Sequence, residues 1–274
     1  MPINNRDFNY IRRLLLDRTS VVLEEDKIYL VESRLAPLAK DAGVNSVEQL
    51  IFKLRNQSFG TLHQQVIEEM MTTETFFFRD IRPFEALEKF VFPDLIEKRN
   101  RDRTLNIWCA ACSSGQEPYS IAMLIREEFP YLTRWKVSLI ASDISSKMLD
   151  IARMGCYSQH QISRGLPAKL REKYFARQGT KWQIDNNILQ MVEFLQLNIA
   201  ETLPYLPSMD IIFLRNVLIY FDVDTKKKIL TKVQQLLRPD GYLFLGAGET
   251  TINLNNYFEP LKFNKAVAYR LRKI

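Results

Sequence analysis

One stretch of this 274-residue sequence, residues 105–124, constrains the fold more than any other. It begins with an apolar run, Leu105–Cys109, of the length expected for a buried strand. A loop of small residues around Gly115 follows, and Pro118 suits the first turn of a helix, where its missing N–H has no partner to lose. This order predicts the first unit of a doubly wound α/β sheet, in which ligands bind at the carboxyl ends of the strands.

The loop after this strand favours a ligand without phosphate groups. A dinucleotide fingerprint requires three glycines, but only Gly115 is present, and no Gly-Lys-Ser/Thr motif accompanies it. Glu117 instead places a carboxylate at the start of the helix, which suits a ligand with an ammonium group, such as S-adenosylmethionine. From this motif alone, an α/β domain with a tight first turn and another ligand is an equal alternative.

The rest of the sequence divides into a helical part and an α/β part. Apolar residues at helical spacing predict a bundle of four helices over residues 1–72. Residues 73–84 include three consecutive phenylalanines, which fit no amphipathic helix, and we interpret them as a linker. Strand and helix patterns alternate over residues 85–274, which predicts a mostly parallel sheet with helices on both faces.

Four finer predictions concern the α/β part. A small antiparallel subdomain is expected as an insertion at about 166–196, with one strand at Trp182–Ile184 and another at Ile188–Phe194. Residues 98–103 are expected to form a solvated basic turn, and Arg238–Gly241 another turn. The strand at Ala266–Leu271 is expected at the edge of the sheet.

Composition narrows the class of protein without naming a function. The sequence is 46% hydrophobic and 26% charged, as in ordinary globular proteins, and its net charge of +6 permits an acidic partner without requiring one. It has no signal-peptide pattern and no membrane-spanning apolar run, so we expect a cytoplasmic protein. Cys109 and Cys112 form a C-x-x-C pair without a second pair, and we interpret them as buried small hydrophobes with no metal.

Polar residues follow several predicted strands at the edge where a ligand would bind. Asp143 is positioned to meet ribose hydroxyls, or to cap the next helix, and we favour the ribose role. Asn198 fits an adenine contact and a turn equally well. Arg215 and Asn216 follow the strand that ends at Leu214, and a buried arginine there requires a partner, which favours a functional role.

Five motifs together resemble one family. They are Thr-Thr-Glu-Thr-Phe-Phe-Phe-Arg-Asp (72–80), Cys-Ser-Ser-Gly-Gln-Glu-Pro-Tyr-Ser-Ile-Ala-Met (112–123), Ala-Ser-Asp-Ile (141–144), Phe-Leu-Arg-Asn-Val-Leu-Ile-Tyr-Phe (213–221) and Leu-Arg-Pro-Asp-Gly-Tyr-Leu-Phe-Leu-Gly (237–246). The chain resembles CheR-type chemotaxis receptor methyltransferases over almost its whole length. The resemblance implies a class I methyltransferase sheet with an N-terminal helical bundle and a small inserted antiparallel β-subdomain.

The resemblance also implies the activity and the site. A member of this family uses S-adenosylmethionine to esterify glutamate side chains on the cytoplasmic helices of chemoreceptors, leaving S-adenosylhomocysteine. The family pattern maps cofactor contacts onto Thr73, Thr75, Arg79, Glu117, Asp143, Asn198, Ile199, Arg215 and Asn216. It places Arg79 and Tyr220 beside the transferred methyl group. The alternative for Arg79 is a surface residue at the domain junction, and the alternative for Tyr220 is an aromatic residue of the core. Thr73 departs from the family's usual asparagine, although a hydroxyl still donates and accepts.

The expected partner is the cytoplasmic domain of a chemoreceptor (a methyl-accepting chemotaxis protein). The candidates for docking the receptor are three basic residues of the helical domain: Lys27 and Arg34, which share one helix face, and Lys40 nearby. The alternative is that these charges only form a solvated face of the helix. A regulatory adaptor is a further candidate partner, and we expect a monomer that neither binds nucleic acid nor inserts into a membrane. The hairpin region 176–183 is short, which favours a member that needs no receptor C-terminal peptide.

Two other classes of protein compete with this interpretation. A methyltransferase for RNA or a small molecule predicts a basic groove or stacking aromatics, but the basic stretch 98–103 is too short to supply one. A non-catalytic cofactor-binding regulator is the second class. Retention of Arg79, Glu117, Asp143 and Tyr220 together argues against lost activity.

Overall fold

The computed structural model describes residues 3–272, which form two compact units. The first unit contains the chain up to Thr72 together with Tyr220–Thr225, and the second contains Thr73–Ile219 and Lys226–Ile274. Within residues 3–272, the helices are all too short or too polar to cross a bilayer. Each unit has its own hydrophobic core and is described by itself.

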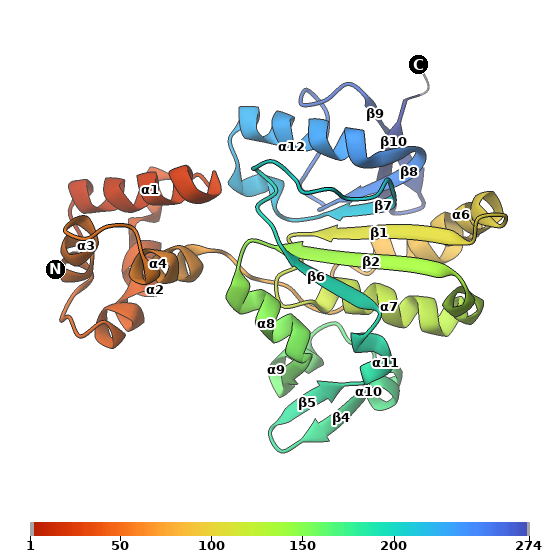
Figure 1. The fold of residues 1–274 in the computed structure, drawn as a ribbon, viewed down its shortest axis with the longest axis horizontal. Coiled ribbons are helices and arrows are strands. Elements are labelled where there is room, and N and C mark those ends of the chain that lie inside the picture. Colours follow the sequence, from red (N-terminus) through yellow and green to blue (C-terminus); the bar gives the residue numbers. More distant parts are fainter. Residues whose placement is uncertain (1–2, 273–274) are drawn as a thin grey trace. The chain divides into compact units, whose positions relative to one another are not determined.

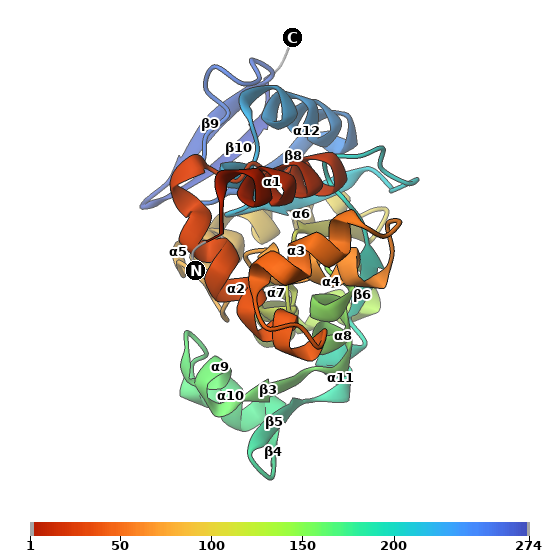
Figure 2. The same cartoon turned by 90° about the vertical axis from the view of Figure 1, so that its left-hand side faces the viewer.

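The first unit is the predicted bundle of four α-helices (Figure 2). Its elements are α1 (Asn5–Thr19), the 3-10 turn η1 (Glu25–Lys27), α2 (Ile28–Asp41), α3 (Val47–Arg55) and α4 (Thr61–Met70). Asn4 caps α1, because its side-chain oxygen accepts from the Asp7 N–H at 2.9 Å. The apolar stripes of the helices meet in one core. Tyr220–Thr225 joins this unit through the Val22 N–H, which donates to the Tyr220 carbonyl at 2.9 Å.

The second unit is built on a seven-stranded sheet (Figure 1). Its strands are β1 (Thr104–Ala110), β2 (Lys136–Asp143), β6 (Val192–Gln196), β7 (Met209–Leu214), β8 (Leu237–Leu245), β9 (Phe258–Phe263) and β10 (Ala266–Leu271). The order is β6-β2-β1-β7-β8-β10-β9, and β10 runs antiparallel to β8 and β9. The predicted doubly wound, mostly parallel sheet is confirmed.

Helices connect these strands. They are α5 (Arg82–Ala86), the π-turn η2 (Leu87–Val91), α6 (Phe92–Arg99), α7 (Gln116–Glu128), the 3-10 turn η3 (Pro130–Arg134), α8 (Ser146–Met154), α9 (Gln159–Ser163), α10 (Ala168–Tyr174), α11 (Asn186–Leu189), the 3-10 turn η4 (Leu218–Tyr220) and α12 (Val223–Leu236). The chain winds from β1 through α7 to β2, and from β7 through α12 to β8 in the opposite direction. Right-handed crossovers therefore place α7 and α12 on opposite faces, with the topological switch point between β1 and β7.

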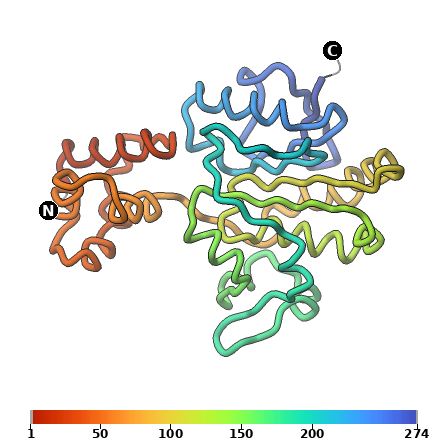
Figure 3. Tube along the Cα trace, in the orientation of Figure 1, coloured from red at the N-terminus to blue at the C-terminus, as the bar shows by residue number. Residues whose placement is uncertain are grey.

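The insertion is a separate three-stranded antiparallel sheet. It consists of β3 (Cys156–Ser158), β4 (Phe175–Gln178) and β5 (Lys181–Ile184), in the order β3-β5-β4. The trace in Figure 3 leaves the main sheet after α8 and returns to it as β6. The predicted insertion strand at Ile188–Phe194 is wrong. Its first part lies in α11, and β6 pairs in parallel with β2, whose open edge supplies the backbone partners that sequence periodicity cannot identify.

Two predictions at the other end of the sheet are also wrong. Ala266–Leu271 is not an edge strand, because β10 lies between β8 and β9, and β9 carries Pro260, a residue suited to an edge. Arg238–Gly241 is not a separate turn but an irregular part of β8. Leu237 pairs with Met209 and Tyr242 with Ile211, so the segment bulges opposite a single residue of β7.

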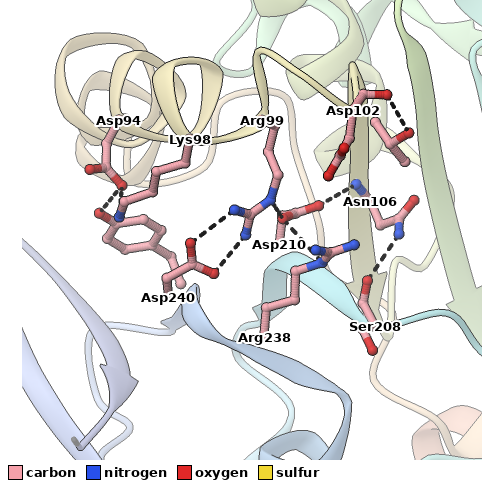
Figure 4. Close-up of polar contacts among 11 residues, drawn as sticks. Asp94, Lys98, Arg99, Asp102, Asn106, Ser208, Asp210, Arg238 and Asp240 are labelled. Carbon is pink, nitrogen blue, oxygen red and sulfur yellow. Dashed lines mark hydrogen bonds and ion pairs between the residues drawn. The ribbon is translucent and has the colours of Figure 1, made fainter.

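Residues 98–103 are not a purely solvated turn, because Arg99 is buried in an ionic network (Figure 4). Arg99 Nε donates to Asp210 Oδ1 at 2.7 Å, and its two terminal nitrogens donate to Asp240 at 2.9 and 2.6 Å. The other oxygen of Asp210 accepts the Asn106 N–H of β1 at 2.8 Å. The arginine ties α6 to β7 and β8 at the end of the sheet opposite the predicted ligand edge.

The aromatic segment in residues 73–84 is packed into the core of the second unit. Phe77 is fully buried, and its ring meets those of Tyr157 and Phe175 at centroid distances of 5.2 and 5.5 Å. The Phe78 N–H donates to Ser120 Oγ of α7 at 2.9 Å. This packing explains why phenylalanines follow one another here. The segment is irregular, so adjacent rings can point into different parts of the core.

Gly165 allows the insertion to approach this aromatic segment closely. Its φ is +81°, and a Cβ there would lie 2.0 Å from the Phe77 carbonyl oxygen. We expect Gly165→Ala to lower the free energy of unfolding by more than about 2 kcal/mol. This loss exceeds the strain of a left-handed alanine alone, because the added Cβ also clashes with the Phe77 carbonyl. Gly179→Ala is the matched control, because its φ is +60° but nothing lies within 4 Å. Urea unfolding that gives equal losses for both variants would contradict this steric explanation.

Candidate functional site

The loops after β1, β2 and β7 meet at the carboxyl edge of the sheet, because β1 pairs with both neighbours. The Ser113 N–H, after β1, donates to Asp143 Oδ2 at 2.8 Å, and the other oxygen of Asp143 accepts the Ser145 N–H at 2.9 Å. The residue that caps α8 is Ser145, whose side chain accepts from the Met148 N–H. Asp143 therefore joins two loops at this edge and is not the helix cap.

The loop after β1 has a strained backbone. Ala111 and Ser113 have φ values of 58° and 50°, which non-glycine residues adopt rarely, and Gly115 has a φ of +90°. A Cβ at Gly115 would lie 2.9 Å from Ala152 Cβ of α8, so glycine also permits close packing there. Such strain persists only where the surrounding structure holds it, and it clusters at functional sites.

A buried ion pair joins the first turn of α7 to the loop after β7. Arg215 Nη1 donates to Glu117 Oε2 at 2.8 Å, and the Arg215 side chain is 1% exposed. Its Nη2 donates to Asp80 Oδ2 at 2.7 Å and to the Arg79 carbonyl at 2.9 Å. Burial raises the pKa of the Glu117 carboxyl above its usual value, and the adjacent guanidinium opposes that shift. Arg215 thus has the partner that its buried position requires.

The aromatic segment borders the same loops. The Thr73 carbonyl accepts from Ser113 Oγ at 2.8 Å, and Thr75 is half-buried. Arg79 is also half-buried; its Nη1 donates to the Glu74 carbonyl at 2.8 Å, and its guanidinium lies 5.5 Å from the centre of the Phe76 ring. The segment is therefore tied by backbone contacts to both β1 and β7 loops.

The loop after β6 contains Asn198 and Ile199. Asn198 Oδ1 accepts the Ala200 N–H at 3.0 Å, which is the turn contact that the sequence allowed as one alternative. The Ile199 side chain is buried, and its carbonyl accepts from Lys232 Nζ of α12 at 2.6 Å. Lys232 also reaches the Glu201 carbonyl at 2.6 Å and so anchors this loop to the helix.

Sequence reasoning missed Asp80 and Glu249. Glu249, after β8, accepts the backbone N–H groups of Asn216, Val217, Leu218 and Gly246 at 2.7, 2.9, 2.7 and 2.7 Å. Asp80 is the last residue of the motif at 72–80, and Glu249 lies three residues after the motif at 237–246, so their acidic side chains near these motifs were the available signal. Nothing in the sequence, however, indicated which groups they would contact.

Two polar side-chain atoms on the consecutive residues Arg215 and Asn216 have no hydrogen-bond partner in the part of the chain that the structure describes. Within residues 3–272, four buried side-chain nitrogen or oxygen atoms lack a hydrogen bond, and Arg215 Nε and Asn216 Oδ1 are two of them. Asn216 also has a left-handed φ of 57°. Buried polar atoms are rarely left unsatisfied, so a ligand can supply an acceptor to Arg215 Nε and a donor to Asn216 Oδ1.

Two further predictions concern Tyr220 and the cysteine pair. Tyr220 ends η4 and belongs to the first unit, whereas Glu117, Asp143, Arg215 and Asn216 gather in the second. Cys109 and Cys112 are buried and free, and burial raises the pKa of both thiols well above the usual range, as suits small hydrophobes.

The three candidate docking residues all lie in the first unit but differ in their surroundings. Lys27 pairs with Asp26 at 2.7 Å, and Lys40 is exposed on α2. Arg34 is half-buried and donates to the Met70 carbonyl at 2.6 Å and to Thr72 Oγ1 at 3.2 Å. Arg34 therefore holds the end of α4 as well as facing solvent.

Comparison with known proteins agrees with the two units. Residues 6–71 match the family described as "CheR methyltransferase, all-alpha domain", and residues 73–267 match "CheR methyltransferase, SAM binding domain". The chain is 40% identical to chemotaxis protein methyltransferase 1 of Pseudomonas aeruginosa, covering 99% of this chain and all of that one. It is 38% identical to chemotaxis protein methyltransferase Cher2 of Pseudomonas putida with the same coverage, and 37% identical to chemotaxis protein methyltransferase 1 of Vibrio cholerae, covering 99% of each chain. With both domains matched in order, this chain belongs to the CheR methyltransferase family.

Proposed function

We propose that this protein transfers the methyl group of S-adenosylmethionine to glutamate side chains of chemoreceptors, forming methyl esters for chemotactic adaptation. Membership of the family and full-length relatives named as chemotaxis protein methyltransferases support this function. The observation that carries it is the buried Glu117–Arg215 pair at the topological switch point, where doubly wound sheets bind ligands.

The residues at this edge fit S-adenosylmethionine. Asn216 Oδ1 and Arg215 Nε are a buried acceptor and donor without partners, and the ligand carries ammonium, carboxylate and hydroxyl groups. We assign Glu117 to the ammonium group, Asp143 to the ribose and Asn198 with Ile199 to the adenine side. Thr73, Thr75 and Arg79, in the aromatic segment, complete the proposed contacts.

The cofactor supplies a methyl group already activated on a sulfonium. The receptor glutamate is ionised at neutral pH, so no residue of this chain has to remove a proton. One C–S bond breaks and one C–O bond forms, and the protein's contribution is alignment in a dry site. We assign Arg79 to steering the incoming carboxylate and Tyr220 to orienting it.

Incubation with methyl-labelled cofactor and receptor-rich membranes tests the activity. The expected product is labelled receptor from which mild base releases the label, as it does from a carboxyl methyl ester. Arg79→Ala is expected to slow transfer by at least about tenfold, because it removes a charge-assisted contact. Base-stable label would refute the ester, and full activity of Arg79→Ala would remove Arg79 from this role.

The assignment of Glu117 predicts a pH dependence of cofactor binding. An ammonium group requires the ionised carboxylate, and burial raises the pKa of Glu117, so affinity begins to fall at a higher pH than for an ordinary glutamate. Below that pKa, the affinity for S-adenosylhomocysteine is expected to fall about tenfold per pH unit. Calorimetric titration at several pH values measures this, and Glu117→Gln should bind weakly at every pH. An unchanged pH dependence in that variant would reassign the titrating group.

We assign receptor docking to the helical domain through Lys27, Arg34 and Lys40. Lys40→Glu is the sharpest probe, because Lys40 is exposed, whereas Arg34 also holds Met70 and Thr72. We expect Lys40→Glu, alone or with Lys27→Glu, to raise the KM for receptor, more at low than at high ionic strength. Arg13→Glu, an equal charge change at an exposed position of α1, is the control. Equal KM values for all variants would refute docking on this face.

The remaining proposals concern partners and location. We assign the protein to the cytoplasm as a monomer, with a regulatory adaptor as a further partner. β4 and β5 are joined by the two residues Gly179 and Thr180, and this short hairpin supports a member that needs no receptor C-terminal peptide. Truncating that peptide should leave the methylation rate unchanged.

A filter-binding assay that retained RNA would instead favour a nucleic-acid substrate.

A further inference from the structure

Glu249 occupies an unusual position, because one carboxylate receives four backbone N–H groups. Oε2 accepts from Asn216 and Gly246, and Oε1 accepts from Val217 and Leu218. Three of these donors are consecutive residues of the turn after β7. Glu249 itself follows β8, so a single side chain joins the turns after two neighbouring strands at the ligand edge.

The turn at residues 216–218 depends on this carboxylate. Consecutive N–H groups that converge around a residue of left-handed φ, here Asn216 at 57°, form a concave site for an anion. The three donors point to the same carboxylate, which lies 31 to 33 residues away in the chain. The protein therefore supplies its own anion and fixes a backbone conformation that an asparagine alone adopts only at a cost.

We infer that Glu249 is a positioning residue for methyl transfer. It holds the turn that presents Asn216 Oδ1, a buried acceptor without a partner, and it sets the start of η4, which ends at Tyr220. This inference rests on the proposed roles of Asn216 and Tyr220. The hydrogen bonds that the Glu249 side chain accepts among residues 3–272 all come from backbone N–H groups, so we assign its effect on the reaction to the turn that it holds.

Gly246 is shaped for the same contact. A Cβ at this position would lie 2.6 Å from Asn216 Nδ2, 2.7 Å from Glu249 Oε2 and 2.9 Å from the Asn216 nitrogen. No side chain can therefore stand between the carboxylate and the turn. Gly246→Ala offers a way to disturb the contact without removing the charge of Glu249.

The test compares Glu249→Gln with Gly246→Ala, using Glu193→Gln, an isosteric loss of charge at an exposed position of β6, as the control. The amide of a glutamine replaces one carboxylate oxygen and leaves two N–H donors without an acceptor. One or more amide hydrogens of residues 216–218 should exchange about tenfold faster in both test variants. In parallel, kcat should fall by about tenfold or more, while the KM for receptor stays unchanged. Each kcat is calculated per molecule of protein that binds S-adenosylhomocysteine, so that unfolded protein does not count.

The outcomes separate this inference from the proposed function. Tyr220→Phe and Asn216→Gly, which keeps the left-handed backbone, are measured alongside. Full activity in both would refute their proposed roles and with them the basis of the inference. If they lose activity while Glu249→Gln keeps wild-type exchange and kcat, the positioning role alone is refuted. If Glu249→Gln does not fold, Gly246→Ala decides the question by the same two measurements.

Discussion

Arg215→Met is expected to reduce receptor methylation by about 100-fold or more, because Arg215 holds both the first turn of α7 and the aromatic segment. The same change should lower the free energy of unfolding by about 3–5 kcal/mol, since it leaves the Glu117 carboxylate buried without a counter-charge. The guanidinium donates three hydrogen bonds, to Glu117, to Asp80 and to the Arg79 carbonyl. Urea unfolding and initial rates of methyl transfer measure the two effects.

Two further variants separate stability from function. Arg215→Met combined with Glu117→Gln should recover much of the stability but not the activity, because the buried charge is gone while the cofactor contacts are still missing. Arg215→Lys keeps the charge but provides one compact donor group in place of a planar fork, so methylation should remain low. Wild-type methylation by Arg215→Lys would show that the bridge to the aromatic segment is not required.

The stability loss of Arg215→Met should also depend on pH. Burial is the largest influence on Glu117, and without Arg215 its main opposition is gone, so the pKa of this carboxyl in the folded state lies further above that in the unfolded state. A group of this kind favours the folded state below its pKa and opposes it above. The variant should therefore regain stability, relative to the wild type, as the pH falls into the acidic range. Parallel stability curves for the two proteins would contradict this explanation.

Arg99→Met is expected to lower the free energy of unfolding by about 3–5 kcal/mol, although residues 98–103 resemble an exposed basic turn. Asp210 is fully buried, and removing Arg99 leaves its carboxylate with only the Asn106 N–H and a longer 3.4 Å contact to Arg238. Added salt should change this loss little, because buried pairs are weakly screened. Arg101→Met, at an exposed position of the same turn, should change stability by less than about 0.5 kcal/mol.

The pH dependence of this loss has a definite sign. The hydrogen bonds from Arg99 hold the pKa of Asp240 below its usual value. A depressed pKa contributes stability that is present above the unfolded pKa and lost as the pH falls through the folded one. The difference between wild type and Arg99→Met should therefore shrink in acid. An equal loss for Arg99→Met and Arg101→Met, at neutral pH, would show that the network does not stabilise the fold.

Much of the site was predictable from its place after the strands. Glu117, Asp143, Arg215 and Asn216 each follow a strand pattern, and the carboxyl ends of parallel strands meet at one edge. Their pairing was not predictable. Asp80 and Arg215 are 135 residues apart, and the contact between them depends on how the aromatic segment packs.

The sequence by itself determined the helical bundle, the alternating strands and helices, and the residues at the ligand edge, because each follows from local periodicity or from position relative to a strand. Only the tertiary structure decided that β6 joins the main sheet, that β10 lies inside it, that Arg99 is buried and that Glu249 holds the turn after β7. The physical reason is the same in each case. Strand neighbours and buried ion pairs join residues far apart in the chain, and a local pattern carries no record of which distant group will satisfy a strand edge or a charge.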